Sequence, residues 1–305
     1  MNKKIFLTIL FALTGVMANA QLLYKISGKG LTAPSYIVGT YHFANVAFVD
    51  SIPGIRQAME DSQQVYGELL MGEMADADSL ALIQQAMMLP DSLTIDKLLS
   101  ADEMNRLNVY MKSQLGVDMT HPQLAQLGRM KPSALSEMLT SLICIKKGGS
   151  IDAQNGFDDY FQKDARAHGK DVGALETLAF QIKLLTDGAS LERQKELLMC
   201  LVDHSAFMEE MMEGIIRAFY SQDLEAVKDA MDMKLNNSCD SSPEEVAELV
   251  DKRNADWLTK MPALMAQKPT LFAVGAGHLP GENGVLSLLR QSGYHVEPVY
   301  GQSHH

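Results

Sequence analysis

The chain has 305 residues, 47% of them hydrophobic, which is enough to bury one large core or two closely packed ones. It carries 26 basic and 38 acidic side chains, a net charge of −12, and because residues 1–20 hold two lysines and no acid, the remainder carries −14. Such an acidic surface excludes nucleic acid and anionic membranes as expected partners.

Residues 1–20 have the pattern of a cleavable signal peptide. Lys3 and Lys4 precede an apolar run over 5–16, and Ala18-Asn19-Ala20 is a small-x-small cleavage site. We expect cleavage near Ala20/Gln21 and a periplasmic or secreted protein, with a retained N-terminal anchor as the alternative. No later stretch is apolar for long enough to span a membrane, so we expect no span in the mature chain.

The next elements alternate between strand and helix patterns. The chain predicts a hairpin of strands over 22–26 and 35–41, a short helix over 53–59, a strand over 64–69 and a mainly helical region over 76–145. The capping-box sequence Ser100-Ala101-Asp102-Glu103 starts one helix of that region, which runs to Gly116.

The second half repeats this alternation. It predicts a helix over 156–168, a strand over 171–174, a mainly helical region over 178–266 with a break at 236–242, a strand over 270–275, a helix over 281–291 and a strand over 294–299. The fold class is therefore α/β. We expect a central mixed, largely parallel sheet built from the N- and C-terminal halves, with a large helical insertion, in one domain over 21–300. Residues 301–305 would form a disordered tail.

Two Gly-x-x-His motifs follow apolar strands, one near each end of the chain. They are Gly39-Thr40-Tyr41-His42 and Gly275-Ala276-Gly277-His278. In α/β sheets ligands bind at the carboxyl ends of the strands, and small residues there let a group approach the backbone closely.

Glu68 and Glu176 also stand at predicted strand ends. Because the ends of parallel strands converge, these carboxylates can share a pocket with His42 and His278. Two imidazoles with carboxylates are a typical ligand set for a divalent metal with an open coordination position. A metal bound in this way would activate water for hydrolysis. A carboxylate off the metal would serve as general base. Two alternatives remain open, namely metal-free acid/base hydrolysis and ordinary solvated turn residues.

Three cysteines follow the signal peptide: Cys144, Cys200 and Cys239. Cys200 and Cys239 are the favoured pair because both flank one helical segment, and free buried thiols are the alternative. The chain lacks Cys-x-x-Cys, Gly-x-Ser-x-Gly, P-loop, His-Glu-x-x-His and dinucleotide-binding motifs.

Around the two Gly-x-x-His motifs and the strand-end glutamates, the sequence resembles the TraB/GumN family. This family is related to the Tiki proteins and belongs to a wider group with erythromycin esterases and ChaN-like proteins. The resemblance covers roughly residues 22–300, and the segments that carry it are 24–26, 34–42, 66–69, 156–161, 169–177, 252–257 and 274–281. The resemblance implies an erythromycin-esterase/ChaN/Tiki-like fold and, in the Tiki branch, a metal-dependent protease using manganese or cobalt-like ions, with zinc as a further candidate.

By the resemblance, His42, Glu68 and His278 are the expected metal ligands and, with Glu176 and Arg253, the expected catalytic residues. Asp158, Asn254, Gly39 and Gly275 would support them. A guanidinium such as that of Arg253 can hold a substrate carboxylate or a developing oxyanion. The alternative is that Arg253 is a surface residue on a long charged helix. The expected function is a metal-dependent hydrolase, most plausibly a Tiki-like peptidase acting on a peptide or small molecule. The alternatives are a binding protein for a peptide, haem-like or polysaccharide-related ligand, and a metal-free esterase.

Overall fold

The computed structural model describes residues 21–148 and 156–301, so the predicted signal peptide and nearly all of the predicted tail lie outside it. Its strands are β1 (Leu23–Ser27), β2 (Ser35–Thr40), β3 (Gln64–Gly67), β4 (Asp171–Ala174), β5 (Thr270–Gly275) and β6 (His295–Pro298). The longer helices are α1 (Ile55–Asp61), α2 (Ala77–Ala86), α4 (Ala101–Leu115), α5 (Pro132–Lys146), α6 (Phe157–Ala167), α7 (Leu178–Asp187), α8 (Leu191–Asp203), α9 (Ser205–Tyr220), α10 (Leu224–Met231), α12 (Lys252–Gln267) and α13 (Val285–Gln291). The shortest are α3 (Ile95–Leu98) and α11 (Pro243–Val246).

The strands form one six-stranded mixed sheet in the order β4-β3-β5-β2-β1-β6. β4, β3, β5 and β2 run parallel to one another, whereas β1 is antiparallel to both β2 and β6. This confirms the predicted mixed, largely parallel sheet and its N-terminal hairpin. β2 is buried at every position and β5 at all but its last. Strands covered on both faces are expected to be apolar along their whole length, which is why these two could be recognised in the sequence.

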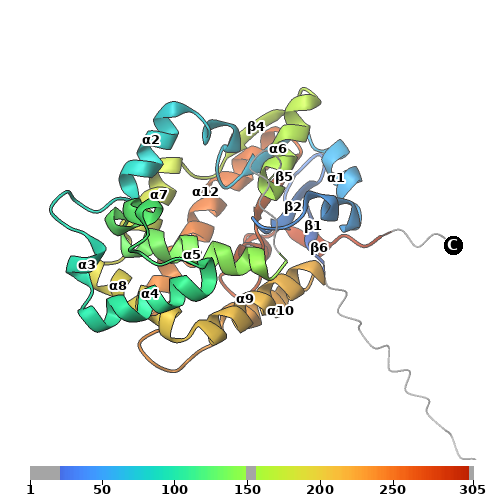
Figure 1. Cartoon of the computed structure of the whole chain (residues 1–305). Helices are drawn as coiled ribbons and strands as arrows, with labels where there is room; N and C mark the ends of the chain where they lie inside the picture. Colours follow the sequence, from blue (N-terminus) through green and yellow to red (C-terminus); the bar gives the residue numbers. More distant parts are fainter. Residues whose placement is uncertain (1–20, 149–155, 302–305) are drawn as a thin grey trace, which may run out of the picture.

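The apolar side chains form two clusters. The larger one surrounds the sheet and includes Phe157 and Phe161 of α6, Trp257 of α12 and Leu289 of α13. The smaller lies among α3, α4, α5 and α8 and contains Leu107. Figure 1 shows α2 to α5, α7 and α8 gathered beside the sheet, and we call these helices the helical portion. The regions predicted to be helical also contain α9, α10 and α12, whose apolar side chains belong to the larger cluster around the sheet. No helix among residues 21–148 and 156–301 is long and apolar enough to cross a membrane.

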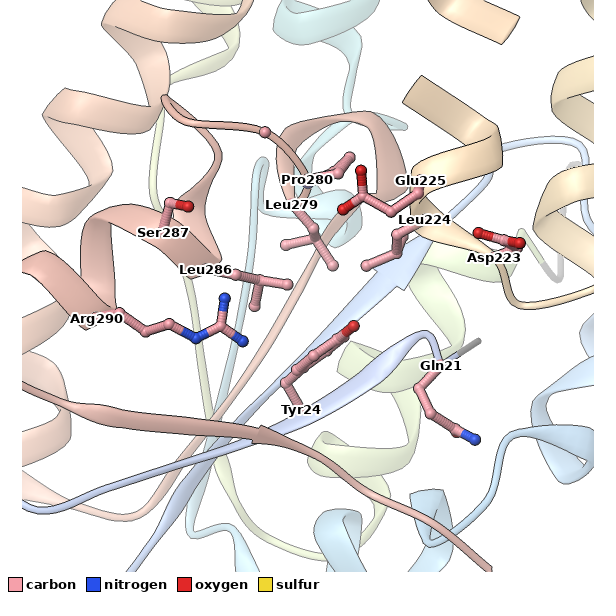
Figure 2. Close-up of a pocket in the computed structure, with 11 residues that line it drawn as sticks. Gln21, Tyr24, Asp223, Leu224, Glu225, Leu279, Pro280, Leu286, Ser287 and Arg290 are labelled. Carbon is pink, nitrogen blue, oxygen red and sulfur yellow. The ribbon is translucent and has the colours of Figure 1, made fainter. Parts of the chain in front are cut away.

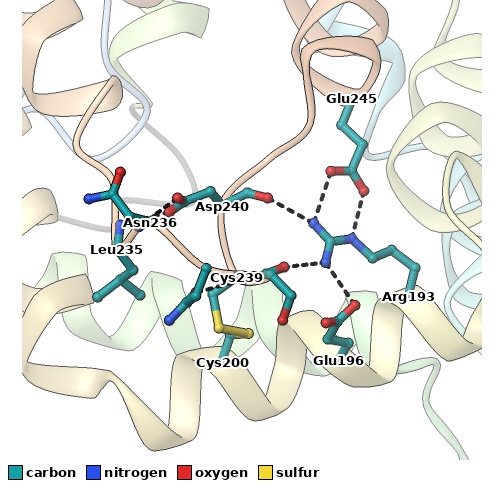
Figure 3. Close-up of a disulfide and its surroundings, with 10 residues drawn as sticks. Arg193, Glu196, Cys200, Leu235, Asn236, Cys239, Asp240 and Glu245 are labelled. Carbon is teal, nitrogen blue, oxygen red and sulfur yellow. Dashed lines mark hydrogen bonds and ion pairs between the residues drawn. A yellow bond between two sulfur atoms is a disulfide. The ribbon is translucent and has the colours of Figure 1, made fainter.

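A disulfide joins Cys200 of α8 to Cys239 in the segment between α10 and α11, while Cys144 is a buried free thiol. Next to the disulfide, the Arg193 guanidinium binds both carboxylate oxygens of Glu245, at 2.8 and 3.0 Å (Figure 3). It also donates to Glu196 at 2.8 Å and to the carbonyls of residues 238 and 240. The helical portion is thus tied to the start of the helix that leads into α12.

Some element boundaries differ from those predicted. The strand expected over 64–69 ends at Gly67, so Glu68 and Leu69 leave the sheet. The helix expected over 281–291 begins only at Val285, because Gly281 has a φ of +88° and Gly284 is extended. A side chain at Gly284 would lie 2.2 Å from the Pro280 carbonyl oxygen, so a tight turn precedes the helix. The long helix predicted from Ser242 contains a π-helical turn over Ala247–Asp251.

Candidate active site

The carboxyl ends of four parallel strands bring the predicted site residues to one edge of the sheet. β2 pairs with β5 so that Thr40 stands opposite Gly275, and β3 pairs with β5 so that Gly67 stands opposite Ala273. β4 pairs with β3 in the same direction. Four side chains follow these strands directly and therefore share the edge, as predicted: His42, Glu68, Glu176 and His278.

Gly39 and Gly275 allow the close packing of this edge. A Cβ atom at Gly39 would lie 3.1 Å from the Ala276 Cα, so β2 and the loop after β5 approach too closely for a larger residue. A Cβ atom at Gly275 would lie 3.1 Å from Oε1 of Glu68. In its absence the Gly275 N–H donates to that oxygen at 2.8 Å. Both glycines thus have a structural reason to be small.

Glu176 is buried and fully hydrogen-bonded. Its carboxylate is 2% exposed and accepts from Nε of Arg253 at 2.7 Å, from Nη2 of Arg253 at 2.9 Å and from the Trp257 indole at 2.9 Å. The Gln181 amide donates a fourth hydrogen bond at 3.3 Å. With its lone pairs engaged in this way, Glu176 is suited to holding Arg253 in place rather than to taking a proton from a substrate.

Arg253 uses every N–H of its guanidinium within the protein. In addition to Glu176, Nη2 donates to Oε2 of Glu68 at 2.6 Å, and Nη1 donates to the Leu249 carbonyl at 3.1 Å and to Nε2 of His278 at 3.0 Å. A guanidinium has five N–H donors, and these contacts account for all of them. In this arrangement Arg253 has no donor left for a substrate carboxylate or an oxyanion, so its geometry is that of a brace between Glu68, Glu176 and His278.

The protonation of His278 follows from Asn254, which is fully buried. The Asn254 amide nitrogen donates to the carbonyls of His278 at 3.3 Å and Asn283 at 2.8 Å, which fixes the orientation of the amide because carbonyls only accept. Its oxygen must then accept from Nδ1 of His278, 2.7 Å away. The proton of the neutral ring is therefore on Nδ1, and Nε2 presents a lone pair.

The charges around His278 and Glu68 agree with this tautomer. Burial, together with the nearby Arg253 charge, lowers the pKa of His278 to about 4, so the ring is neutral at physiological pH. Burial by itself would raise the pKa of Glu68, but three partners hold it below its usual value: His278, which becomes charged in acid, the Arg253 guanidinium and the Gly275 N–H. Oε1 of Glu68 lies 4.0 Å from Nε2 of His278.

His42 is held from the other side by helix α6. Its Nδ1 lies 2.6 Å from Oδ2 of Asp158, and Oδ1 of the same carboxylate accepts from the Thr40 hydroxyl. The imidazole is 70% exposed, whereas Asp158 is largely covered. The Asp158 charge raises the pKa of His42 to about 9. Because Nδ1 is engaged by a carboxylate, Nε2 is the nitrogen of His42 that is open to a ligand.

His42, Glu68, Asp158 and Gln181 line one small pocket with a volume of about 30 Å³, enough for a water-sized group. The buried Gln162 amide supports its wall by donating to the Leu69 carbonyl at 2.7 Å and accepting from the Met71 N–H at 3.1 Å. Glu68 therefore belongs both to the His42 pocket and to the Arg253–His278 network.

The residues present fit a divalent metal in the kind of donors they offer. Each histidine is oriented through Nδ1 by a protein oxygen, the arrangement typical of imidazole ligands, and Glu68 stands between them. In the part of the chain that the structure describes, no three His, Cys, Asp or Glu side chains stand close enough together to hold a metal ion. The His278 lone pair is engaged by Arg253, so a metal would have to exchange with that hydrogen bond.

Three members of the network were not predicted: Thr40, Gln181 and Trp257. The Trp257 ring packs against His278 with centroids 4.5 Å apart and the ring planes inclined at 44°, and the Arg253 guanidinium lies 5.3 Å from the Trp257 ring. The spacing of four between Arg253 and Trp257 could have revealed their common helix face. No such signal marks Gln181, which reaches Glu68 at 3.1 Å only because α7 follows β4 closely.

The sequence matches the TraB/PrgY/gumN family over residues 22–298, a range that includes every residue of this site. The chain belongs to the TraB/PrgY/gumN family. The comparison confirms the resemblance found in the sequence and covers almost the whole described part of the chain.

This TraB/PrgY/gumN family member is similar to several curated proteins named as Tiki metalloproteases. It is 25% identical to metalloprotease TIKI2 of Danio rerio, over 87% of this chain and 58% of that protein. It is 26% identical to metalloprotease TIKI1 of Danio rerio, over 87% and 60% respectively, and 24% identical to a TIKI homolog of Nematostella vectensis, over 88% and 65%. The chain thus matches only about three fifths of the length of these relatives. No solved structure matches it significantly.

Proposed function

We propose that this protein is a metal-dependent hydrolase of the peptidase class, in which His42, Glu68 and His278 hold one divalent ion. The observation that carries the proposal is the matched orientation of the two imidazoles. Asp158 and Asn254 each engage an Nδ1 atom, so both histidines would bind a metal through Nε2 at the sheet edge where Glu68 stands. The metal would displace the proton from Nε2 of His42 and the Arg253 hydrogen bond from Nε2 of His278. The similarity to Tiki metalloproteases supports the same chemistry.

A bound divalent ion would polarise a peptide carbonyl and lower the pKa of a bound water. Other residues of the chain would hold the three ligands in position. Asp158 and Asn254 orient the two imidazoles, and the Gly275 N–H and Arg253 keep Glu68 ionised and fixed. Glu176 neutralises Arg253 in the interior.

Metal-free hydrolysis is a second candidate, because His42 and Glu68 line the same pocket and have pKa values shifted in opposite directions. The protonated His42 would donate the proton that a leaving group needs, and the Glu68 carboxylate would accept a proton from the attacking water. This acid/base pair would suit an ester or a peptide.

The first test is metal content. Elemental analysis would be made on protein lacking His304 and His305, beside the variants His42→Ala, His278→Ala and the double variant. His168→Ala is the matched control, since this histidine is exposed at the C-terminal end of α6 and is not one of the proposed ligands. We expect about one equivalent of manganese, cobalt or zinc, lost in the double variant and retained in the control.

The second test is hydrolysis of a peptide library and of simple esters before and after chelation. Cleavage that is lost with chelator and restored by manganese or cobalt supports the metal-dependent hydrolase. Cleavage that survives complete chelation but is lost in His42→Ala assigns the metal-free pair. If neither metal nor hydrolysis is found under any condition, both proposals are wrong, and a ligand-binding role on this scaffold takes their place.

A further inference from the structure

A second pocket, with a volume of about 260 Å³, lies behind the loop that follows His278. Its floor is made of leucine side chains from three different elements: Leu224 at the start of α10, Leu279 in the loop and Leu286 of α13. All three are almost completely buried, so packing fixes their positions. None of the residues lining the small pocket of His42 and Glu68 lines this one.

The rim of this leucine pocket carries opposite charges that the protein leaves unpaired. Arg290 donates from Nε and Nη2 to the Val296 carbonyl at 3.2 and 3.0 Å, and its Nη1 has no hydrogen-bond partner among the described residues. The Glu225 carboxylate likewise has no ion-pair partner in the described part of the chain. Figure 2 shows the Arg290 guanidinium and the Glu225 carboxylate on different sides of the leucine side chains.

Asp223, whose carboxylate accepts from the Ala226 N–H at 3.0 Å, and neutral polar groups complete the lining. Tyr24 lies below the leucine side chains in Figure 2. Burial raises the pKa of its phenol, the Arg290 charge lowers it, and the Glu225 and Asp223 charges raise it. Gln21 is only 8% exposed, and its side-chain oxygen has no hydrogen-bond partner in the described structure. A buried amide oxygen without a partner is unusual, because most such groups are satisfied by protein or solvent.

We propose that the leucine pocket binds a small zwitterion with an apolar body, that is, a free aliphatic amino acid or a dipeptide. Arg290 would hold the carboxylate, and Glu225 the ammonium group, while the side chain would lie on Leu224, Leu279 and Leu286. The volume equals that of roughly nine water molecules at ~30 Å³ each, which suits a ligand of this size. A simple anion would leave Glu225 unmatched, and a simple cation would leave Arg290 unmatched.

This inference does not depend on the proposed hydrolase activity. The pocket contains none of the predicted metal ligands, although Leu279 and Pro280 of its wall directly follow His278 in the chain. A ligand bound here would therefore contact the loop that carries His278. It would do so whether or not the sheet edge performs hydrolysis.

The test is isothermal titration with leucine, leucyl-leucine, N-acetyl-leucyl-leucine and leucyl-leucine amide. The protein would carry His42→Ala, which prevents turnover of the peptide under either candidate mechanism. We expect saturable one-to-one binding of leucine or leucyl-leucine. Removing either terminal charge should weaken binding by about tenfold, because each charge-assisted hydrogen bond is lost with its partner.

Two variants assign the contacts. Glu225→Gln should weaken leucyl-leucine but leave the N-acetylated peptide unchanged, and Arg290→Gln should weaken leucyl-leucine but leave the amide unchanged. Glu297→Gln, which removes an exposed carboxylate on β6 outside the pocket, is the control and should change neither. If no probe binds, or if binding is unaffected by both pocket variants and is lost in Glu68→Gln, the proposal is overturned.

Discussion

Asn254 decides which nitrogen of His278 is available at the sheet edge. Its amide nitrogen is committed to two backbone carbonyls, so its oxygen has to accept from Nδ1 of the imidazole. The Asp158 carboxylate likewise engages Nδ1 of His42. A neutral amide and a charged carboxylate thus give the two histidines the same orientation but different proton affinities.

Asn254→Ala should weaken the binding of manganese or cobalt by roughly 10–100-fold, the usual effect of removing an outer-shell partner of a histidine ligand. Equilibrium dialysis or isothermal titration with the metal measures this effect. Asn108→Ala is the control, since Asn108 accepts from the Met119 backbone at 3.0 Å in the helical portion. An equal loss of affinity in both variants would show that Asn254 acts only through stability.

Arg253→Met should lower the free energy of unfolding by about 3–5 kcal/mol, because it leaves the buried Glu176 carboxylate without its cation. The double variant Arg253→Met/Glu176→Leu should recover much of this loss, since it removes both buried charges. Urea unfolding of the two single variants and the double variant measures the coupling. Strictly additive effects would contradict the view that Arg253 and Glu176 form one brace.

At the scale of elements, helix α12 places Arg253, Asn254 and Trp257 over the edge of the sheet. It continues directly from α11 through the π-helical turn Ala247–Asp251, and the Leu249 carbonyl of that turn accepts from Arg253. The start of α11 is held by the Ser242 capping box and by the Arg193–Glu245 pair (Figure 3). Contacts in the helical portion therefore help to set the position of the candidate site.

Removal of the Cys200–Cys239 disulfide should lower the free energy of unfolding by about 2–4 kcal/mol, the typical value for a crosslink that closes a loop of tens of residues. Urea unfolding of the Cys200→Ser/Cys239→Ser variant measures the loss. Cys144→Ser tests the buried free thiol separately. If the double variant is as stable as the native protein, the Arg193 contacts alone hold this segment.

The Arg193–Glu245 pair should contribute stability that disappears in acid. Arg193 holds the pKa of Glu245 below its ordinary value of 4.5. A carboxyl group with a depressed pKa contributes stability that is present above the ordinary value and is lost as the pH falls through the folded-state pKa. The difference in unfolding free energy between the native protein and Glu245→Gln should therefore be present at neutral pH and vanish in acid. Glu192→Gln, an exposed carboxylate on the same helix as Arg193, should give a much smaller difference at neutral pH.

At the scale of the whole molecule, local sequence patterns could predict which residues meet at the carboxyl ends of the parallel strands. His42, Glu68, Glu176 and His278 each follow an apolar run, and a parallel sheet brings such positions together without further information. The roles of Arg253 and Gln181 could not be predicted in this way. Whether Arg253 is a surface charge or a saturated buried brace depends on how α12 packs over the sheet. Gln181 depends in the same way on where α7 begins.

The two C-terminal strands should contribute very differently to folding. β5 lies in the middle of the sheet and pairs with both β2 and β3, whereas β6 is an edge strand that pairs only with β1. A chain ending at Pro269 should show no cooperative unfolding transition, whereas a chain ending at Gly293 should keep a weakened one. Circular dichroism during thermal unfolding separates the two cases. A cooperative transition in the shorter chain would show that β2 and β3 need no common partner.

The central position of β5 also fixes when the protein can fold during synthesis. β2 and β3 leave the ribosome early, but the strand that lies between them is made only after the entire helical portion. Until then two apolar strand edges have no partner, a state in which nascent chains are prone to aggregation. The sheet therefore cannot be completed until β5 has been synthesised. His278, which follows β5 directly, joins His42 and Glu68 only when nearly the whole chain has emerged.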